Sequence, residues 1–149
     1  MKNLMLFAIV WLMLISCQDT NRTPGDVYFE RGEYQKAVEA YTDILDTDTR
    51  NIKMLYNRGR SYQELKKYDK AMEDFNRILK LEDKSPDASF SVASIYLSQN
   101  KFEDAQFYAA KAIEHSNNNS DAYFLRVRSL HKQGKFGEAI EDYEEFKKI

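Results

Sequence analysis

The sequence predicts an all-α protein built from four copies of one two-helix unit. Alanine recurs every 34 residues, at Ala37, Ala71, Ala105 and Ala139. An aromatic residue stands three positions before each alanine, at Tyr34, Tyr68, Phe102 and Phe136. A fixed period of this length is typical of repeat architectures, in which each copy is one supersecondary unit.

Residues 1–16 differ from the rest and are expected to be a signal peptide. One basic residue, Lys2, precedes an apolar run from Leu4 to Ile15. A helix of that length rises about 18 Å, which is too short for a hydrocarbon core of about 30 Å. The run suits the apolar centre of a secretory signal. A buried core helix is the alternative, but the run has no polar face.

The run ends in Leu14-Ile-Ser-Cys17, which resembles the lipobox of bacterial lipoproteins. The resemblance implies cleavage before Cys17, acylation of Cys17, for example with palmitate, and a lipid anchor in a membrane of the bacterial cell envelope, facing the periplasm or the surface. An ordinary signal with an incidental cysteine is the alternative. Cys17 is the only cysteine, so no intramolecular disulfide is expected. Residues 17–25 are then the lipidated cysteine and a flexible tether ending at a Pro-Gly turn signal.

Four helical hairpins are expected at residues 26–51, 52–85, 86–119 and 120–149, with the first helix of the first hairpin cut short by Pro24-Gly25. In the second hairpin, apolar residues follow the helical period on both sides of a short break. In the other copies that break contains residues that tolerate a left-handed backbone, namely Gly32, Asn100 and Gly134. Lys66 stands there in the second copy and should be strained. Ser85-Pro86 and Ser120-Asp121 are the expected helix caps.

The repeated pattern resembles the tetratricopeptide repeat, W-x2-L-G-x2-Y followed by A-x3-F and P. The second copy places Leu55, Arg58, Gly59, Tyr62, Ala71, Phe75 and Asp83 at these positions. Every Trp place and every Pro place departs from the pattern. The resemblance covers about residues 25–149 and implies a right-handed superhelix of stacked hairpins, with the first helices on the concave side.

Composition and motifs argue against nucleic-acid binding and catalysis. The chain has 22 basic and 24 acidic residues without a basic block. Its two histidines, His115 and His131, lie in different predicted helices, and no cluster has metal-ligand spacing. The carboxylates near Asp142 are interpreted as a solvated helix face. No metal and no cofactor are expected, and an enzyme is the least favoured class.

The remaining candidate site is the concave surface implied by the resemblance. Its predicted partner-binding residues are Tyr56, Asn57, Arg60, Phe90, Ser94, Phe124, Arg128 and His131. Aromatic anchors beside basic groups suit a peptide or a partner helix, although a partly buried structural role is the alternative for the aromatics. The predicted function is a membrane-tethered protein–protein interaction adaptor. The alternative is a structural subunit of a cell-envelope assembly complex, of the outer-membrane protein or pilus assembly type.

A homodimer is a further expectation. A stacked repeat needs a cap, and part of the apolar stripe of the predicted last helix, from Lys135, must cover its own partner helix. The alternative to an association surface is that the partner helix covers the whole stripe. Phe146 and Ile149 are expected to remain uncovered. Two copies would then associate end to end about a twofold axis.

Overall fold

The structure is a computed structural model that describes residues 22–116 and 118–148. Within them the chain forms eight α-helices joined by short turns. Their bounds are α2 Pro24–Glu30, α3 Tyr34–Thr47, α4 Ile52–Glu64, α5 Tyr68–Leu81, α6 Pro86–Ser98, α7 Phe102–His115, α8 Ser120–Lys132 and α9 Phe136–Phe146. The predicted signal peptide and Cys17 lie outside the described residues.

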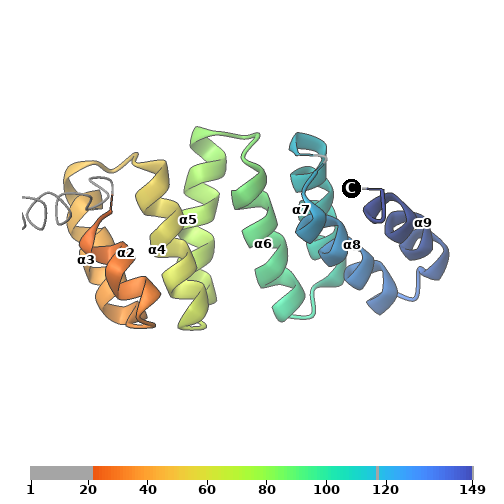
Figure 1. Cartoon of the computed structure of the whole chain (residues 1–149), viewed down its shortest axis with the longest axis horizontal. Helices are drawn as coiled ribbons and strands as arrows, with labels where there is room; N and C mark the ends of the chain where they lie inside the picture. Colours follow the sequence, from red (N-terminus) through yellow and green to blue (C-terminus); the bar gives the residue numbers. More distant parts are fainter. Residues whose placement is uncertain (1–21, 117, 149) are drawn as a thin grey trace, which may run out of the picture.

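The helices pair into four hairpins that follow one another in a row, from α2 and α3 at one end to α8 and α9 at the other (Figure 1). Each helix packs on the next one in the chain, and α6 also contacts α4 and α8. The second, third and fourth hairpins coincide with the predicted repeats, and α2 is the short first helix expected from Pro24-Gly25. The all-α array of hairpins is therefore confirmed.

One residue with positive φ closes each hairpin, at the predicted break. These residues are Gly32, Lys66, Asn100 and Gly134, with φ of 73°, 57°, 58° and 76°. Glycine adopts this conformation without steric cost, whereas a lysine pays roughly 1–2 kcal/mol. The strain expected at Lys66 is confirmed, because the turn geometry is the same in all four hairpins.

The helix starts agree with the predicted caps only in part. Ser85 caps α6 as expected, since its hydroxyl accepts from the Ala88 N–H. The cap of α8 is Asn119 and not Ser120, because the Asn119 side-chain oxygen accepts from the Ala122 N–H at 2.9 Å. Asn119 directly precedes the first helical residue, Ser120, so its side chain can accept a hydrogen bond from an N–H of the first turn.

The predicted tether extends too far. It was expected to end at Gly25, but α2 begins at Pro24, and Thr23 caps it through a capping box with Asp26. Pro24 suits the first helical position because its missing N–H needs no partner there. Gly25 is buried against Tyr41, so residues 23–25 belong to the folded part.

The core runs along the row of hairpins. The four alanines of the repeat column are buried, with Ala37, Ala71 and Ala105 fully inaccessible and Ala139 7% exposed. Small residues at these places let two helices approach closely, as Gly59 does against the Phe75 ring. In the last helix Ala139 is the one buried residue among those described, so burial decreases towards α9.

Candidate functional site: the α2–α4 groove

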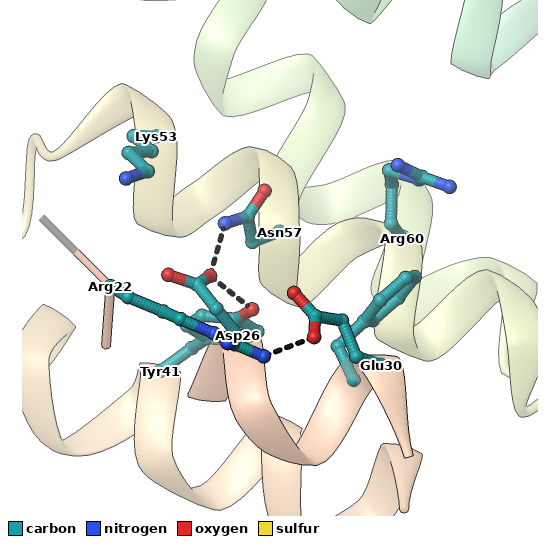
Figure 2. Close-up of a pocket in the computed structure, with 8 residues that line it drawn as sticks. Arg22, Asp26, Glu30, Tyr41, Lys53, Asn57 and Arg60 are labelled. Atoms are coloured by element: carbon teal, nitrogen blue, oxygen red, sulfur yellow. Dashed lines mark hydrogen bonds and ion pairs between the residues drawn. The ribbon is translucent and has the colours of Figure 1, made fainter. Parts of the chain in front are cut away.

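The first two hairpins form an open groove, called here the α2–α4 groove, with a volume of about 410 Å³ (Figure 2). It is lined by side chains of α2 and α4, with Tyr41 of α3 at its base and Arg22 before α2. The lining residues are Arg22, Asp26, Phe29, Glu30, Tyr41, Lys53, Asn57 and Arg60. Three of them are basic and two are acidic.

Asp26 is the centre of a hydrogen-bond network that joins α2, α3 and α4. Its Oδ1 accepts from the Tyr41 hydroxyl at 2.7 Å and from the Asn57 amide at 3.0 Å, and its Oδ2 accepts from the Thr23 N–H at 2.9 Å. Burial alone would raise the pKa of Asp26, but the hydrogen bonds with Thr23 and Tyr41 and the charge of Lys53 outweigh it, so the pKa is lowered. The Asp26 carboxylate is therefore a fixed, ionised part of the groove.

Burial, followed by the hydrogen bond to Asp26, raises the pKa of Tyr41 well above its ordinary value. The hydroxyl therefore stays protonated at neutral pH and can only donate to the carboxylate. This one-way donation fixes the Tyr41 ring beneath α2.

The other charged groups of the groove differ in how they are used. Arg22 forms an ion pair with Glu30, so these two charges offset each other. The Arg60 guanidinium lies 5.0 Å from the centre of the Phe29 ring, is exposed, and has no carboxylate partner among the described residues. Arg60 is thus a basic group available to a ligand, placed on an apolar ring.

The structure does not bring the eight predicted partner-binding residues into one site. Asn57 and Arg60 line the α2–α4 groove. Tyr56 and Phe90 are half-buried and pack on the core clusters, Tyr56 with its ring 5.8 Å from that of Phe75. The Ser94 hydroxyl accepts from the Gln63 amide at 3.2 Å.

Phe124, Arg128 and His131 lie on α8, at the other end of the row (Figure 1). Phe124 is 53% exposed, and the Arg128 guanidinium lies 5.8 Å from the centre of its ring. Arg128 and His131 line a second groove between α8 and α9. Of Tyr56, Phe90 and Phe124, which recur every 34 residues, only Phe124 is therefore largely exposed to a partner.

Sequence reasoning missed several residues of the α2–α4 groove, above all Asp26 and Tyr41. Neither was predicted to bind a partner, and Asp26 directly follows the predicted tether. A usable signal was the Thr23-Pro-Gly-Asp26 stretch, because an acid three residues after a threonine is a capping box. That motif places an acidic side chain at the start of α2.

Two partly buried ion pairs were also not predicted from the sequence. Arg58 binds Asp74 with two hydrogen bonds of 2.9 and 2.7 Å, and Arg126 binds Asp142 with two of 2.6 Å. The hydrogen bond to Asp74 raises the pKa of Arg58 despite the opposing effect of burial. The interpretation of Asp142 as part of a solvated face was wrong, because its side chain is 14% exposed and holds Arg126.

The apolar surface at the end of the array is not the predicted one. Phe146 is half-buried, and Ile149 lies outside the described residues. The exposed large apolar residues of α9 are instead Phe136, Ile140 and Tyr143. One period earlier the same positions hold Phe102, Gln106 and Ala109 of α7. The Gln133 amide of the next hairpin donates to the Phe102 carbonyl and to the Gln106 side chain.

Among residues 22–116 and 118–148, no cluster of three or more His, Cys, Asp or Glu side chains is arranged to hold a metal ion. No helix formed by these residues combines the length and the apolar character that crossing a membrane requires.

Comparison with known proteins places this geometry in context. The family model "Tetratricopeptide repeat" matches residues 52–85, and the model "Anaphase-promoting complex, cyclosome, subunit 3" matches residues 74–146. Among curated proteins, DnaJ homolog subfamily C member 7 of Homo sapiens is 39% identical over 77 residues, which cover 49% of this chain and 16% of that protein. This chain therefore spans less than a fifth of that relative's length.

Solved structures share the same arrangement of hairpins. The crystal structure of MamA matches with a TM-score of 0.78 at 24% identity, over 84% of this chain and 73% of that one. The first tetratricopeptide domain of Spaghetti (RPAP3), bound to the HSP90 peptide SRMEEVD, matches with a TM-score of 0.71 at 26% identity, over 74% of this chain and 87% of that one. Residues 52–85 are therefore a tetratricopeptide repeat, and the described chain has the helical-hairpin fold of a tetratricopeptide repeat array.

Proposed function

We propose that this chain is a protein-interaction adaptor that binds an extended acidic segment of another protein in the α2–α4 groove. The main support is the position of Arg60. Its guanidinium is exposed, lies over the Phe29 ring and has no carboxylate partner among the described residues. A carboxylate of the ligand would pair with Arg60, and an apolar side chain beside it would pack on Phe29. Asn57 donates to Asp26 and so helps to hold the hydrogen-bond network at the base of the groove.

The two acidic residues of the groove, Asp26 and Glu30, repel an acidic ligand only weakly, because both already have partners. Glu30 is paired with Arg22, and the oxygens of Asp26 already accept from three donors. The relative at 26% identity supports the same ligand class, because the peptide SRMEEVD bound to it carries three carboxylate side chains.

The proposal is tested by binding of fluorescent heptapeptides, measured as anisotropy. SRMEEVD serves as an acidic probe, and SRMQQVN, in which each carboxylate side chain becomes an amide, is its matched control. We expect tighter binding of the acidic probe. Arg60→Ala should weaken it at least about tenfold, since a hydrogen bond to a charged group contributes about 1.5–3 kcal/mol and each step of about 1.4 kcal/mol is a factor of ten.

Arg77→Ala is the control variant, because Arg77 is an exposed arginine of α5 outside the groove. Helicity should be unchanged in both variants. Equal binding of the two probes, or an Arg60→Ala variant that binds as well as the Arg77→Ala variant, would show that the groove does not select acidic segments.

We further propose that the adaptor is tethered to a bacterial envelope membrane by lipid on Cys17. The support is the short apolar run from Leu4 to Ile15 and the Leu14-Ile-Ser-Cys17 sequence that ends it. Several acyl chains give stable anchoring, whereas a single chain is marginal. The groove would then lie close to the membrane, because few residues separate Cys17 from α2.

Metabolic labelling with palmitate and membrane fractionation test the tether. Cys17→Ala should lose the label and leave the precursor uncut. Ser16→Ala is the matched control and should keep both label and processing, since a small residue remains before the cysteine. A Cys17→Ala variant that is processed and stays on the membrane refutes the tether but leaves the groove proposal intact.

A further inference from the structure

The last hairpin carries an apolar groove with a basic edge, called here the tail groove. It lies between α8 and α9 and has a volume of about 500 Å³. Its apolar part is exposed, with Phe136, Ile140 and Tyr143 accessible at 58%, 63% and 49%. Arg128, His131 and Lys132 line the α8 side, and none of the three pairs with a carboxylate among the described residues.

In the preceding hairpin a helix fills the corresponding place. One period earlier, Ala139 and Tyr143 correspond to Ala105 and Ala109. These two alanines are fully buried in one cluster with Leu125 of α8. The tail groove is thus shaped to receive the hairpin that would come next, and no described helix fills it.

The first hairpin, at the opposite end of the row (Figure 1), carries a second groove, called here the head groove. It lies between α2 and α3 and has a volume of about 540 Å³. Tyr28, Ala40 and Ile44 give it an apolar part, and Glu39 and Asp43 give it an acidic edge. Lys36 also lines it, but its ammonium group is paired with Glu33.

The head groove lies on the side of the first hairpin that corresponds to the side by which the second hairpin packs on the first. Its residue Ala40 corresponds to Asp74 of the second hairpin. Asp74 holds Arg58, and Arg58 donates back to the Thr42 hydroxyl of α3 at 3.1 Å. The same side of the second hairpin therefore packs on the first, and in the first hairpin that side is the head groove.

From these contacts we infer that the tail groove of one copy binds the head groove of a second copy, so that the row of hairpins continues from chain to chain. The contact repeats the packing already made between successive hairpins. It also joins unlike charges, because Arg128, His131 and Lys132 of one copy would face Glu39 and Asp43 of the next. Such a head-to-tail contact does not close on itself and yields open chains.

A twofold dimer through α9, which the sequence suggested, is less favourable on this surface. The twofold axis would place the tail grooves of both copies against each other. Arg128, His131 and Lys132 would then face the same three residues of the partner copy, and like charges in contact oppose association. The occupant that fits the charge is the head groove.

Sedimentation velocity of the purified full-length chain in a mild non-ionic detergent tests the inference. Two variants each block one end. Asp43→Lys reverses the acidic edge of the head groove, and Ile140→Lys places a charge in the apolar part of the tail groove. Both residues are exposed, so the fold should be kept. Phe107→Lys, at an apolar residue of α7 that is 58% exposed, is the matched control.

We expect wild type and Phe107→Lys to form progressively larger species with rising concentration, without stopping at a dimer. Each blocking variant alone should remain monomeric, with association at least roughly tenfold weaker. An equal mixture of the two should stop at a one-to-one dimer, because one variant keeps its tail groove and the other its head groove. A misfolded variant could not produce that dimer.

Three outcomes would overturn the inference. Wild type that is monomeric at every concentration shows that the two grooves do not bind each other, and leaves them to other occupants. A discrete dimer that only Ile140→Lys abolishes indicates the twofold arrangement. A mixture of the two variants that stays monomeric excludes head-to-tail contact through these residues.

Discussion

Gly25→Ala is expected to destabilise the protein, although it places a better helix former in α2. A β-carbon at residue 25 would lie 2.4, 2.6 and 2.8 Å from three atoms of the Tyr41 ring. The ring cannot move aside easily, because its hydroxyl is held by Asp26 at 2.7 Å. The change therefore overpacks the base of the α2–α4 groove.

Two opposing effects set the size of the change. Overpacking a filled core costs about 1–3 kcal/mol, and contacts this short favour the upper part of that range. Replacing glycine by alanine in a helix contributes about 0.5–1 kcal/mol in the other direction. The net loss in the free energy of unfolding should be about 2 kcal/mol.

Gly137→Ala is the matched control. Gly137 is the second residue of α9, as Gly25 is of α2, and a β-carbon there would meet no atom within 4 Å. This variant should be more stable than wild type by about 0.5–1 kcal/mol. Urea unfolding followed by circular dichroism measures both changes. If Gly25→Ala were as stable as Gly137→Ala, the described packing of Tyr41 under α2 would be wrong.

Four further changes test other parts of the structure. Asp74→Ala should cost about 3 kcal/mol in urea unfolding, because it removes a buried carboxylate and leaves the Arg58 guanidinium, whose side chain is only 16% exposed, without its partner. Ala105→Leu should cost about 1–3 kcal/mol at the helix contact, and an unchanged melting temperature would remove Ala105 from that contact. Ser89→Ala should stabilise by about 1 kcal/mol in the same assay, because the buried Ser89 hydroxyl has no hydrogen-bond partner among the described residues. The pKa of Asp26 is lowered on folding, so its ionised form stabilises the protein at pH values above 3.8, the ordinary pKa of the group. This stability is lost as the pH falls through the folded-state pKa. Acid unfolding of Asp26→Asn should therefore depend less on pH than that of wild type.

The fold could be predicted because each hairpin repeats the same local rules. The repeated alanines recur every 34 residues, and so do the turn residues. Each of them makes its contacts within its own hairpin or with the next one. Even the strain at Lys66 followed from comparing the four copies. Periodicity therefore identified the helices and their pairing without any knowledge of distant contacts.

The candidate site could be predicted only in part, because it depends on contacts that the period does not describe. Asp26 meets Tyr41 and Asn57, which are 15 and 31 positions away and belong to different columns of the repeat. Placing these side chains requires the crossing of the helices and not only their order. The 34-residue period also places Phe124 and Tyr56 at equivalent positions, although Phe124 is exposed and Tyr56 packs on the core.

Site-specific photo-cross-linking in cells tests most directly whether the α2–α4 groove binds a protein partner. A photoreactive phenylalanine derivative replaces Glu64, which is exposed on α4 one helical turn beyond Arg60, and Phe107 on α7 serves as the control position. We expect a cross-linked protein from position 64 that is absent from position 107 and is lost when Arg60→Ala is added. Identical products from both positions, or a product from position 64 that persists with Arg60→Ala, would contradict it.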